Sequence, residues 1–205
     1  LGVGASVRFV TKDNQLVERT VIARKTLAGY SSNGSRNYSK DITIGLLNEP
    51  LHADIDGIHF VKVLPDDWAN YLGPMNYSSF DPDEAMPALC LDYEEKALIT
   101  DVRHFSTYVN FTTPALEPRR AYYESKIVGD SGNPALLLLN SQGGGAELVL
   151  LNVWTFGGAG SGASVYENKA EINQIMADLE TQKGFNHGYQ LTEYDFSGFQ
   201  ALGSL

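Results

Sequence analysis

The serine at position 131 is the residue of this chain best placed for covalent chemistry, because it lies in the hexapeptide GDSGNP at positions 129–134. A serine hydroxyl is a poor nucleophile unless a base accepts its proton and nearby donors stabilise the oxyanion that forms. The two glycines permit a tight turn in which backbone N–H groups can converge on a substrate carbonyl. The hexapeptide therefore predicts a nucleophile loop, although an ordinary glycine-rich turn between strands would use the same residue types.

The elements that must position this loop are predicted to be short β-strands. Apolar and polar residues alternate on either side of Asp13-Asn14, which predicts a β-hairpin, and a second hairpin is predicted about 93–95. Apolar runs bounded by turn residues predict the buried strands. The predicted strands lie at 5–11, 16–23, 41–47, 58–64, 87–92, 96–102, 105–111, 134–139 and 147–156.

One amphipathic helix is predicted at 168–182. Four apolar residues share one face at helical spacing, and Asn168 can cap the start of the helix. These four residues are Ile172, Ile175, Met176 and Leu179.

Three regions are predicted along the chain. A stretch rich in Gly, Pro, Asn, Ser and Asp at 72–87 predicts the boundary between two β-subdomains, at 1–75 and 76–183. The remaining residues, 184–205, show no helical period. They could form either an added strand or a linker towards a partner or an anchor.

Composition excludes several classes of protein. Of the 205 residues, 43% are hydrophobic, which is enough for a buried core and argues against disorder. The 25 acidic residues outnumber the 15 basic ones, and no Lys/Arg cluster could follow phosphate groups, so neither nucleic acid nor an anionic membrane is a predicted partner. No apolar run approaches the ~18 residues of a membrane-spanning helix, and the sequence shows no signal peptide.

Cys90 is the only cysteine, so no intrachain disulfide can form. Its apolar neighbours predict a buried, unreactive thiol rather than a nucleophile. Two acidic groups could bind calcium, but neither has the twelve-residue loop pattern of a calcium site, so no cofactor is predicted. These groups are Asp54, Asp56, Asp66 and Asp67, and Asp81, Asp83 and Glu84.

Two motifs together resemble the chymotrypsin-like (trypsin-like) serine proteases. Gly-Asp-Ser-Gly and the proline that follows are similar to the nucleophile loop of that family, and DITIGLL at 41–47 is similar to the strand that carries the triad aspartate. The order of the predicted elements, from residue 5 to residue 179, also resembles that of the family. The resemblance implies an all-β fold of two antiparallel six-stranded β-barrels, the first incomplete at its N-terminus, followed by a C-terminal helix. The lack of disulfides points to a bacterial type.

The resemblance implies a role for each residue of the site. Ser131 would be the nucleophile, and the backbone N–H groups of Gly129 and Ser131 would form the oxyanion hole. Asp41 would fix the tautomer of a histidine and stabilise its imidazolium, although taken alone it could simply end a loop and cap a strand. Asp130 is similar to the family's buried acid, whose ion pair or hydrogen bonds hold the loop in its active shape.

The resemblance also implies a substrate pocket. Ser125 stands six residues before the nucleophile, where it would form the pocket floor and favour an apolar or aromatic side chain, although Glu124 could alter that preference. The wall, and an edge that pairs with a substrate backbone, would come from 153–158. The implied pocket residues are Ser125, Val153, Thr155, Phe156, Gly157 and Gly158.

The catalytic histidine of the family has no match in this sequence. The family places it well before the aspartate, but residues 1–40 contain no histidine. The histidines present all follow Asp41, and none has the family's Ala-Ala-His context; they are His52, His59, His104 and His187. One interpretation places the histidine in sequence upstream of Leu1, and the other is that the base has been lost.

The sequence therefore predicts a serine endopeptidase that hydrolyses peptide bonds through an acyl-enzyme on Ser131. The resemblance implies a secreted, periplasmic or cell-surface protein acting on a peptide or protein substrate. Residues 1–205 alone are expected to be inactive or nearly so, because loss of one triad member removes most of the rate. The alternatives are a protease-like binding module for peptides or proteins and a structural protein that uses the barrels as a scaffold.

Overall fold

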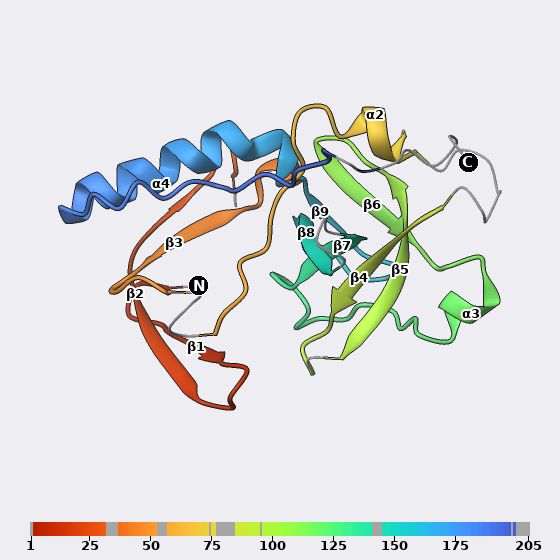
Figure 1. Cartoon of the computed structure of the whole chain (residues 1–205), viewed down its shortest axis with the longest axis horizontal. Helices are drawn as coiled ribbons and strands as arrows, with labels where there is room; N and C mark the ends of the chain where they lie inside the picture. Colours follow the sequence, from red (N-terminus) through yellow and green to blue (C-terminus); the bar gives the residue numbers. More distant parts are fainter. Residues whose placement is uncertain are drawn as a thin grey trace.

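The computed structural model describes residues 2–31, 37–52, 57–73, 75–76, 85–94, 96–140, 145–197 and 199. The fold is mainly β, with antiparallel sheets of three and six strands and a 15-residue helix near the C-terminus (Figure 1). We call these the small sheet and the large sheet.

The small sheet has the strand order β1-β2-β3. Its strands are β1 (Ser6–Val10), β2 (Leu16–Thr26) and β3 (Thr43–Leu47). Val10 pairs with Leu16 across a turn in which Asn14 has a φ of 57°, a value that Asn accepts more readily than most residues. The hairpin predicted from the alternation is therefore confirmed.

The large sheet has the strand order β8-β7-β4-β5-β6-β9. Its strands are β4 (Met86–Leu91), β5 (Ala97–His104), β6 (Tyr108–Thr112), β7 (Pro134–Asn140), β8 (Ala146–Val153) and β9 (Ser161–Ala163). Asn152 of β8 forms a bridge to Ser164, the residue after β9, beside a 2.9 Å bond from the Val165 N–H to the Leu151 carbonyl, and Phe156, beyond the end of β8, forms another to Ser161 of β9. Strand pairing over the described residues does not by itself close either sheet, so the two barrels stay a prediction.

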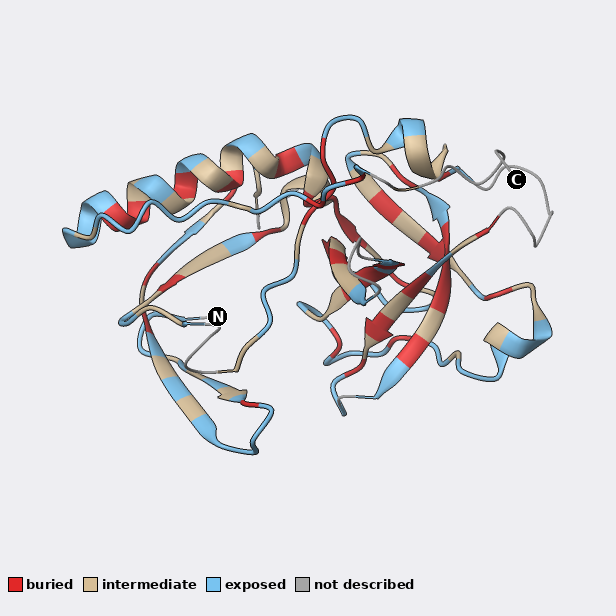
Figure 2. Ribbon diagram, in the orientation of Figure 1, coloured by how far each residue is buried: buried red, intermediate tan, exposed pale blue. Residues whose placement is uncertain are grey.

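Helix α4 (Lys169–Lys183) covers one face of the small sheet (Figure 1). The predicted apolar face is confirmed for Ile172, Ile175 and Leu179, which are buried, and the buried positions recur along the helix in Figure 2. Asn168 occupies the N-cap position without capping the helix. Its amide donates instead to the carbonyls of Ser39 and Ser164, so the predicted cap was wrong because tertiary partners took the side chain.

Short helical elements lie outside the sheets. They are η1 (Tyr38–Lys40), α2 (Ala69–Leu72), α3 (Glu117–Arg120) and η3 (Tyr166–Asn168). The sequence predicts a turn at Asp66-Asp67-Trp68 that could open a single helical turn, and α2 follows it, whereas α3 was not predicted. Elements of three or four residues are too short to show a helical period.

Some predicted strands are shorter in the structure. Of 58–64, only Lys62 and Val63 form bridges, to Val149 and Glu193, and the side chains at 59–61 are all exposed, which breaks the expected alternation. Strand β6 begins at Tyr108 rather than at 105, and β8 ends at Val153 rather than at 156. The predicted linker at 72–87 falls largely on 74 and 77–84, outside the described residues.

Two clusters of buried side chains hold the fold together. The large-sheet core includes Leu137, Val149 and Trp154, and it also takes in Met75. The small-sheet core lies between β2, β3 and α4 and includes Ala163 and Val165 from the end of the large sheet. Because the small-sheet core draws on both sheets, the two halves share packed surface.

Cys90 lies in the large-sheet core with 0% of its surface exposed, which confirms its predicted core position. Burial raises the pKa of its thiol from 9.0 to about 12, while the charge of Lys126 acts in the opposite direction. We expect no reaction with iodoacetamide at about pH 8 until the protein unfolds, because the thiolate is the reactive form.

A pH dependence of stability follows from the same shift. Above about pH 9 the unfolded thiol ionises while the folded thiol keeps its proton, so the free energy of unfolding should fall by about 1.4 kcal/mol per pH unit up to about pH 12. Chemical denaturation across this range measures the slope, and Cys90→Ala should lack this part of it. Equal slopes in the two proteins would contradict the assigned pKa.

Candidate functional site

The loop that carries Ser131 is a tight turn with the serine exposed to solvent. Gly129 and Gly132 have φ values of 118° and 93°, in the region that only glycine adopts without strain. The turn is closed by bonds from the Asp130 N–H to the Ile127 carbonyl (3.2 Å) and from the Asn133 N–H to the Asp130 carbonyl (3.0 Å). Both glycines of the motif are therefore required by the backbone.

Asp130 is the side chain that holds this loop to the rest of the molecule. It is 3% exposed, and its two carboxylate oxygens accept N–H groups from Tyr93 (2.9 Å) and Ile127 (2.7 Å). Tyr93 belongs to the turn between β4 and β5, 37 residues earlier in the chain. The buried carboxylate thus joins the loop to a separate hairpin through charge-assisted hydrogen bonds.

The other side of the loop is bonded to the segment that follows β8. The Gly132 N–H donates to the Trp154 carbonyl, and the Trp154 N–H donates to the Asn133 carbonyl, both at 2.9 Å. Within the described part of the chain, no protein acceptor takes the N–H groups of Gly129 and Ser131 or the Ser131 hydroxyl. The loop is fixed on both flanks while the groups predicted to do chemistry stay available.

Asp41 follows η1 on the small-sheet side and is half-buried. Its N–H donates to the Tyr38 carbonyl at 3.2 Å, and no described residue hydrogen-bonds to or pairs with its carboxylate. Burial raises the pKa of the nearby Tyr108. The hydrogen bond with Ser161 acts in the opposite direction, and the negative charge of Asp41 raises the pKa further. Asp41 therefore lies close to β6 and to its neighbour, the edge strand β9.

The segment 154–156 connects the surroundings of the two predicted catalytic residues. One end bonds to the Ser131 loop through Trp154. At the other end, the ring of Phe156 meets the ring of Tyr38 edge-on, 4.4 Å between centroids, and Tyr38 lies three residues before Asp41. The same short segment therefore touches the elements that carry Ser131 and Asp41.

The residues predicted for the pocket are brought together only in part. Lys126 pairs with Gly158 through bonds of 2.7 and 3.0 Å, which places the 125–126 segment beside 157–158. The Thr155 hydroxyl is buried and has no partner among the described residues, and Phe156 is 45% exposed. Val153 is half-buried and packs against the small-sheet core.

Ser125 lines a polar pocket of about 150 Å³ between the β4–β5 turn and the Ser131 loop. Its lining includes Asp92, Glu94 and Glu124, so the apolar preference predicted from Ser125 gains no support from its surroundings. Asp130 also lines this pocket, but both of its oxygens are already hydrogen-bonded.

Two further side chains of the site, Trp154 and Lys126, were not predicted from the sequence. The Trp154 side chain is 3% exposed, lies against Gly160 and donates from its indole N–H to the Pro134 carbonyl at 3.3 Å. The Lys126 ammonium lies 5.3 Å from the Trp154 ring centre, and Lys126 is 4% exposed. A buried lysine has no sequence signal, whereas a Trp near Gly-rich sequence could have suggested close packing on glycine.

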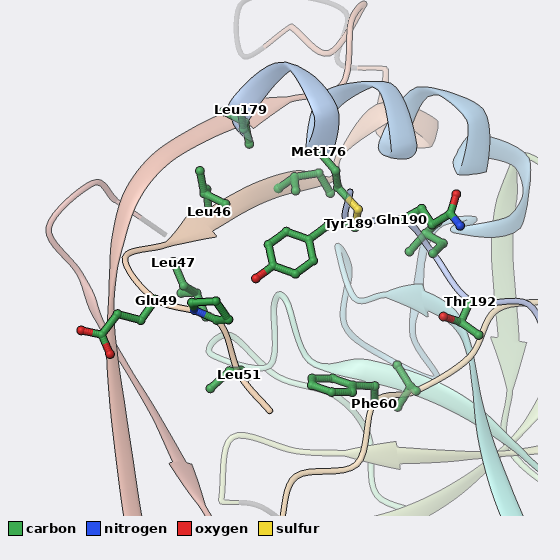
Figure 3. A pocket seen from close by; sticks show the side chains of 15 residues that line it. Leu46, Leu47, Glu49, Leu51, Phe60, Met176, Leu179, Tyr189, Gln190 and Thr192 are labelled. Carbon is green, nitrogen blue, oxygen red and sulfur yellow. The ribbon is translucent and has the colours of Figure 1, made fainter. Parts of the chain in front are cut away.

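A larger, apolar groove of about 410 Å³ lies elsewhere, beside β3 and α4. Figure 3 shows Leu46 and Met176 on one side, Phe60 on the other and the ring of Tyr189 between them. None of its lining residues was predicted for the site. We place the candidate chemistry at Ser131, whose loop is held in place by the buried Asp130, rather than in this larger groove.

The histidines do not complete a triad in this structure. His52, His59 and His104 are exposed, and the His187 ring lies between those of Phe185 and Tyr189. Across the residues that the structure describes, no histidine hydrogen-bonds to Ser131 or Asp41.

Among the described residues, no three His, Cys, Asp or Glu side chains gather where they could hold a metal ion. Asp66 pairs with Lys169 at 2.8 Å, while Asp54, Asp56, Asp81, Asp83 and Glu84 lie outside the described residues. In the same described ranges, no helix combines the length and apolar character needed to cross a membrane.

Comparison with known proteins gives no further assignment. No protein-family model matches the chain, and no curated protein matches it either.

Proposed function

We propose that the chain is the part of a chymotrypsin-like serine endopeptidase that carries the nucleophile and the triad aspartate. The observation that carries this proposal is the Ser131 loop. Its buried Asp130 holds two backbone N–H groups, while the Ser131 hydroxyl and the N–H groups of Gly129 and Ser131 remain unpaired among the described residues. An exposed serine next to free, fixed donors is the arrangement that acyl transfer requires.

The proposed reaction uses Ser131 as the attacking group. Its Oγ attacks the scissile carbonyl carbon while a histidine takes the hydroxyl proton, and the oxyanion accepts hydrogen bonds from Gly129 and Ser131. The histidine returns the proton to the amine that leaves, and water then hydrolyses the ester in the same way. Asp41 would hold that histidine, which sequence upstream of Leu1 would supply.

Two features of the fold support the proposal. The bridge between Asn152 and Ser164 brings the outer strands of the large sheet together, as closure into a six-stranded barrel would require. The small sheet would then be the later half of a first barrel, with Asp41 just before its last strand, β3. A secreted, periplasmic or cell-surface location and a peptide or protein substrate belong to the same proposal.

A second candidate is a protease-like module that binds peptides or proteins without cleaving them. It is favoured by the position of Trp154, which fills the space between Lys126 and Gly160, and by the carboxylate of Asp41, which is unpaired among the described residues. This candidate keeps the fold and the edge at 156–158 but has no base.

Labelling with a fluorophosphonate probe tests the choice, because the serine oxygen displaces fluoride only when it is activated. In the polypeptide that includes the sequence upstream of Leu1, we expect Ser131 to be labelled and Asp41→Asn to slow labelling. Residues 1–205 alone should react at least ~10³-fold more slowly. Ser131→Ala is the control, and peptide mapping identifies the labelled residue.

The contradicting outcome is specific. If the longer polypeptide is folded but Ser131 stays unlabelled, the endopeptidase proposal fails. Binding of peptides by that unreactive protein would then favour the binding module.

A further inference from the structure

We infer that residues 185–196 form a strap that fixes the small sheet against the large sheet. The strap places apolar side chains in both cores. Phe185 and Leu191 pack against the small-sheet core, whereas Tyr194 and Phe196, 4% and 3% exposed, belong to the large-sheet core. In Figure 1 this segment runs back along α4 and crosses to the large sheet.

The first half of the strap is held on helix α4 by a buried carboxylate. Glu180 is 4% exposed, and its oxygens accept the N–H groups of His187 (2.9 Å), Gly188 (3.0 Å) and Tyr189 (3.2 Å). Further along, the Leu191 N–H donates to Asn173 Oδ1 at 2.8 Å. These four hydrogen bonds to helix α4 hold the first half of the strap on the small-sheet side.

The middle of the strap is bonded to Lys62 and Val63, which belong to the segment 62–66 that we call the connector. The Val63 N–H donates to the Thr192 carbonyl and the Tyr194 N–H donates to the Val63 carbonyl, both at 2.9 Å. Lys62 in turn exchanges bonds of 3.0 and 2.8 Å with Leu148 and Leu150 of β8. Strap, connector and β8 therefore lie side by side, so the tail at 192–194 is an added extended segment, attached to β8 through the connector.

One lysine ties these parts to the helix. The Lys169 ammonium bonds to the Leu64 carbonyl (3.0 Å), to Asp66 (2.8 Å) and to Glu193 of the strap, and it lies over the ring of Tyr166. Helix, connector and strap therefore meet at a single cation.

The far end of the strap is anchored on the large-sheet side. The Phe196 ring stacks on Tyr71 with 4.6 Å between centroids and 4° between planes, and the Tyr194 hydroxyl donates to the Asn140 carbonyl. The strap is attached to α4 at one end and to the large-sheet core at the other. It therefore restrains movement of one half relative to the other.

The restraint matters for the candidate site because Asp41 and Ser131 lie in different parts of the fold. Asp41 lies where the two halves meet: the neighbouring Lys40 is paired with Glu171 of α4 at 2.8 Å, while the Asp41 carboxylate lies near Tyr108 of β6. Ser131 lies in the loop that leads into β7 of the large sheet. A bound strap would therefore help to hold Asp41 and Ser131 at a fixed separation, and loss of the strap would loosen that separation. This consequence rests on the proposed function, whereas the strap itself does not.

Spin labels on the two halves test the strap without measuring activity. In a Cys90→Ala background, Val10→Cys on β1 and Leu138→Cys on β7 provide exposed sites, at 70% and 61% exposure. We expect one narrow distance distribution in the chain of residues 1–205 and in a chain ending at 197. A chain ending at 184, which lacks the strap, should at least double the width of the distribution.

A point variant covers the case in which the shortened chain does not fold. Glu180→Ala removes the acceptor for three strap amides and should broaden the distribution, whereas Gln182→Ala, exposed on the same helix, should not. Hydrogen exchange at the Val63 and Tyr194 amides, which make the bonds between strap and connector, should rise at least tenfold in Glu180→Ala. Unchanged width and exchange in Glu180→Ala would overturn the strap, and would leave the labelling test of Ser131 unaffected.

Discussion

Replacement of Gly160 by alanine should cost at least about 4 kcal/mol of stability. A Cβ built on Gly160 would lie 0.9 Å from Cζ3 of Trp154. The ring cannot move aside cheaply, because Trp154 is 3% exposed, packs on Phe111 at 5.1 Å and donates to the Pro134 carbonyl. Expelling a buried indole forfeits ~150–250 Å² of burial, and the φ of 97° adds strain for any L-residue.

Gly158→Ala is the matched control for that experiment. Gly158 also has a positive φ, 73°, but no atom lies within 4 Å of a Cβ built there. It should therefore cost only the backbone strain of about 1–2 kcal/mol. Chemical denaturation of both variants gives the two values, and similar losses would show that Trp154 does not fill the space beside Gly160.

A double variant tests whether the clash with Trp154 is the reason for the loss of stability in Gly160→Ala. Trp154→Ala alone removes the indole and should cost about 3–5 kcal/mol as a cavity. If the clash is the reason for the Gly160 effect, adding Gly160→Ala to Trp154→Ala should cost little more than the strain at Gly158. Additive losses would mean that another contact makes Gly160 necessary.

The parts of the fold that could be predicted from sequence are those with a local physical cause. The β1–β2 hairpin follows from alternation about Asp13-Asn14, and α4 follows from an apolar stripe that includes Ile172 and Leu179. Asn168 shows where local reasoning ends, because its amide bonds to Ser39, 129 residues earlier, in place of the helix it was expected to cap. The strap is a further example, since its bonds to Val63 leave no periodic signal in either segment.

The candidate site also has parts that could be predicted from the sequence and parts that could not. The glycines at 129 and 132 could be predicted to turn the chain, and both have positive φ. Nothing in the sequence indicated that Asp130 would bond to Tyr93, or that Lys126 would be buried beside Trp154, because these contacts form only when separate elements pack. The polar surroundings of Ser125 likewise come from the distant β4–β5 turn.

Replacement of Asp130 by alanine should cost about 3 kcal/mol of stability and reduce Ser131 labelling at least ~10²-fold in the longer polypeptide. The carboxylate accepts two backbone N–H groups, and hydrogen bonds to a charged acceptor contribute about 1.5–3 kcal/mol each. Without it the Ile127 and Tyr93 amides lose their acceptor, and the turn that presents the Gly129 and Ser131 donors is no longer held. Denaturation and probe kinetics measure the two effects separately.

Asp92→Ala distinguishes a damaged loop from a merely less stable protein. Asp92 is 8% exposed and also accepts two backbone N–H groups, from Glu94 (2.9 Å) and Lys96 (2.8 Å), within the neighbouring hairpin turn. Its loss should lower the free energy of unfolding by a similar amount, about 3 kcal/mol, yet leave Ser131 labelling nearly unchanged under conditions where both variants are folded. If Asp92→Ala slowed labelling as much as Asp130→Ala, Asp130 would have no specific part in shaping the loop, and the support it gives to the endopeptidase proposal would be lost.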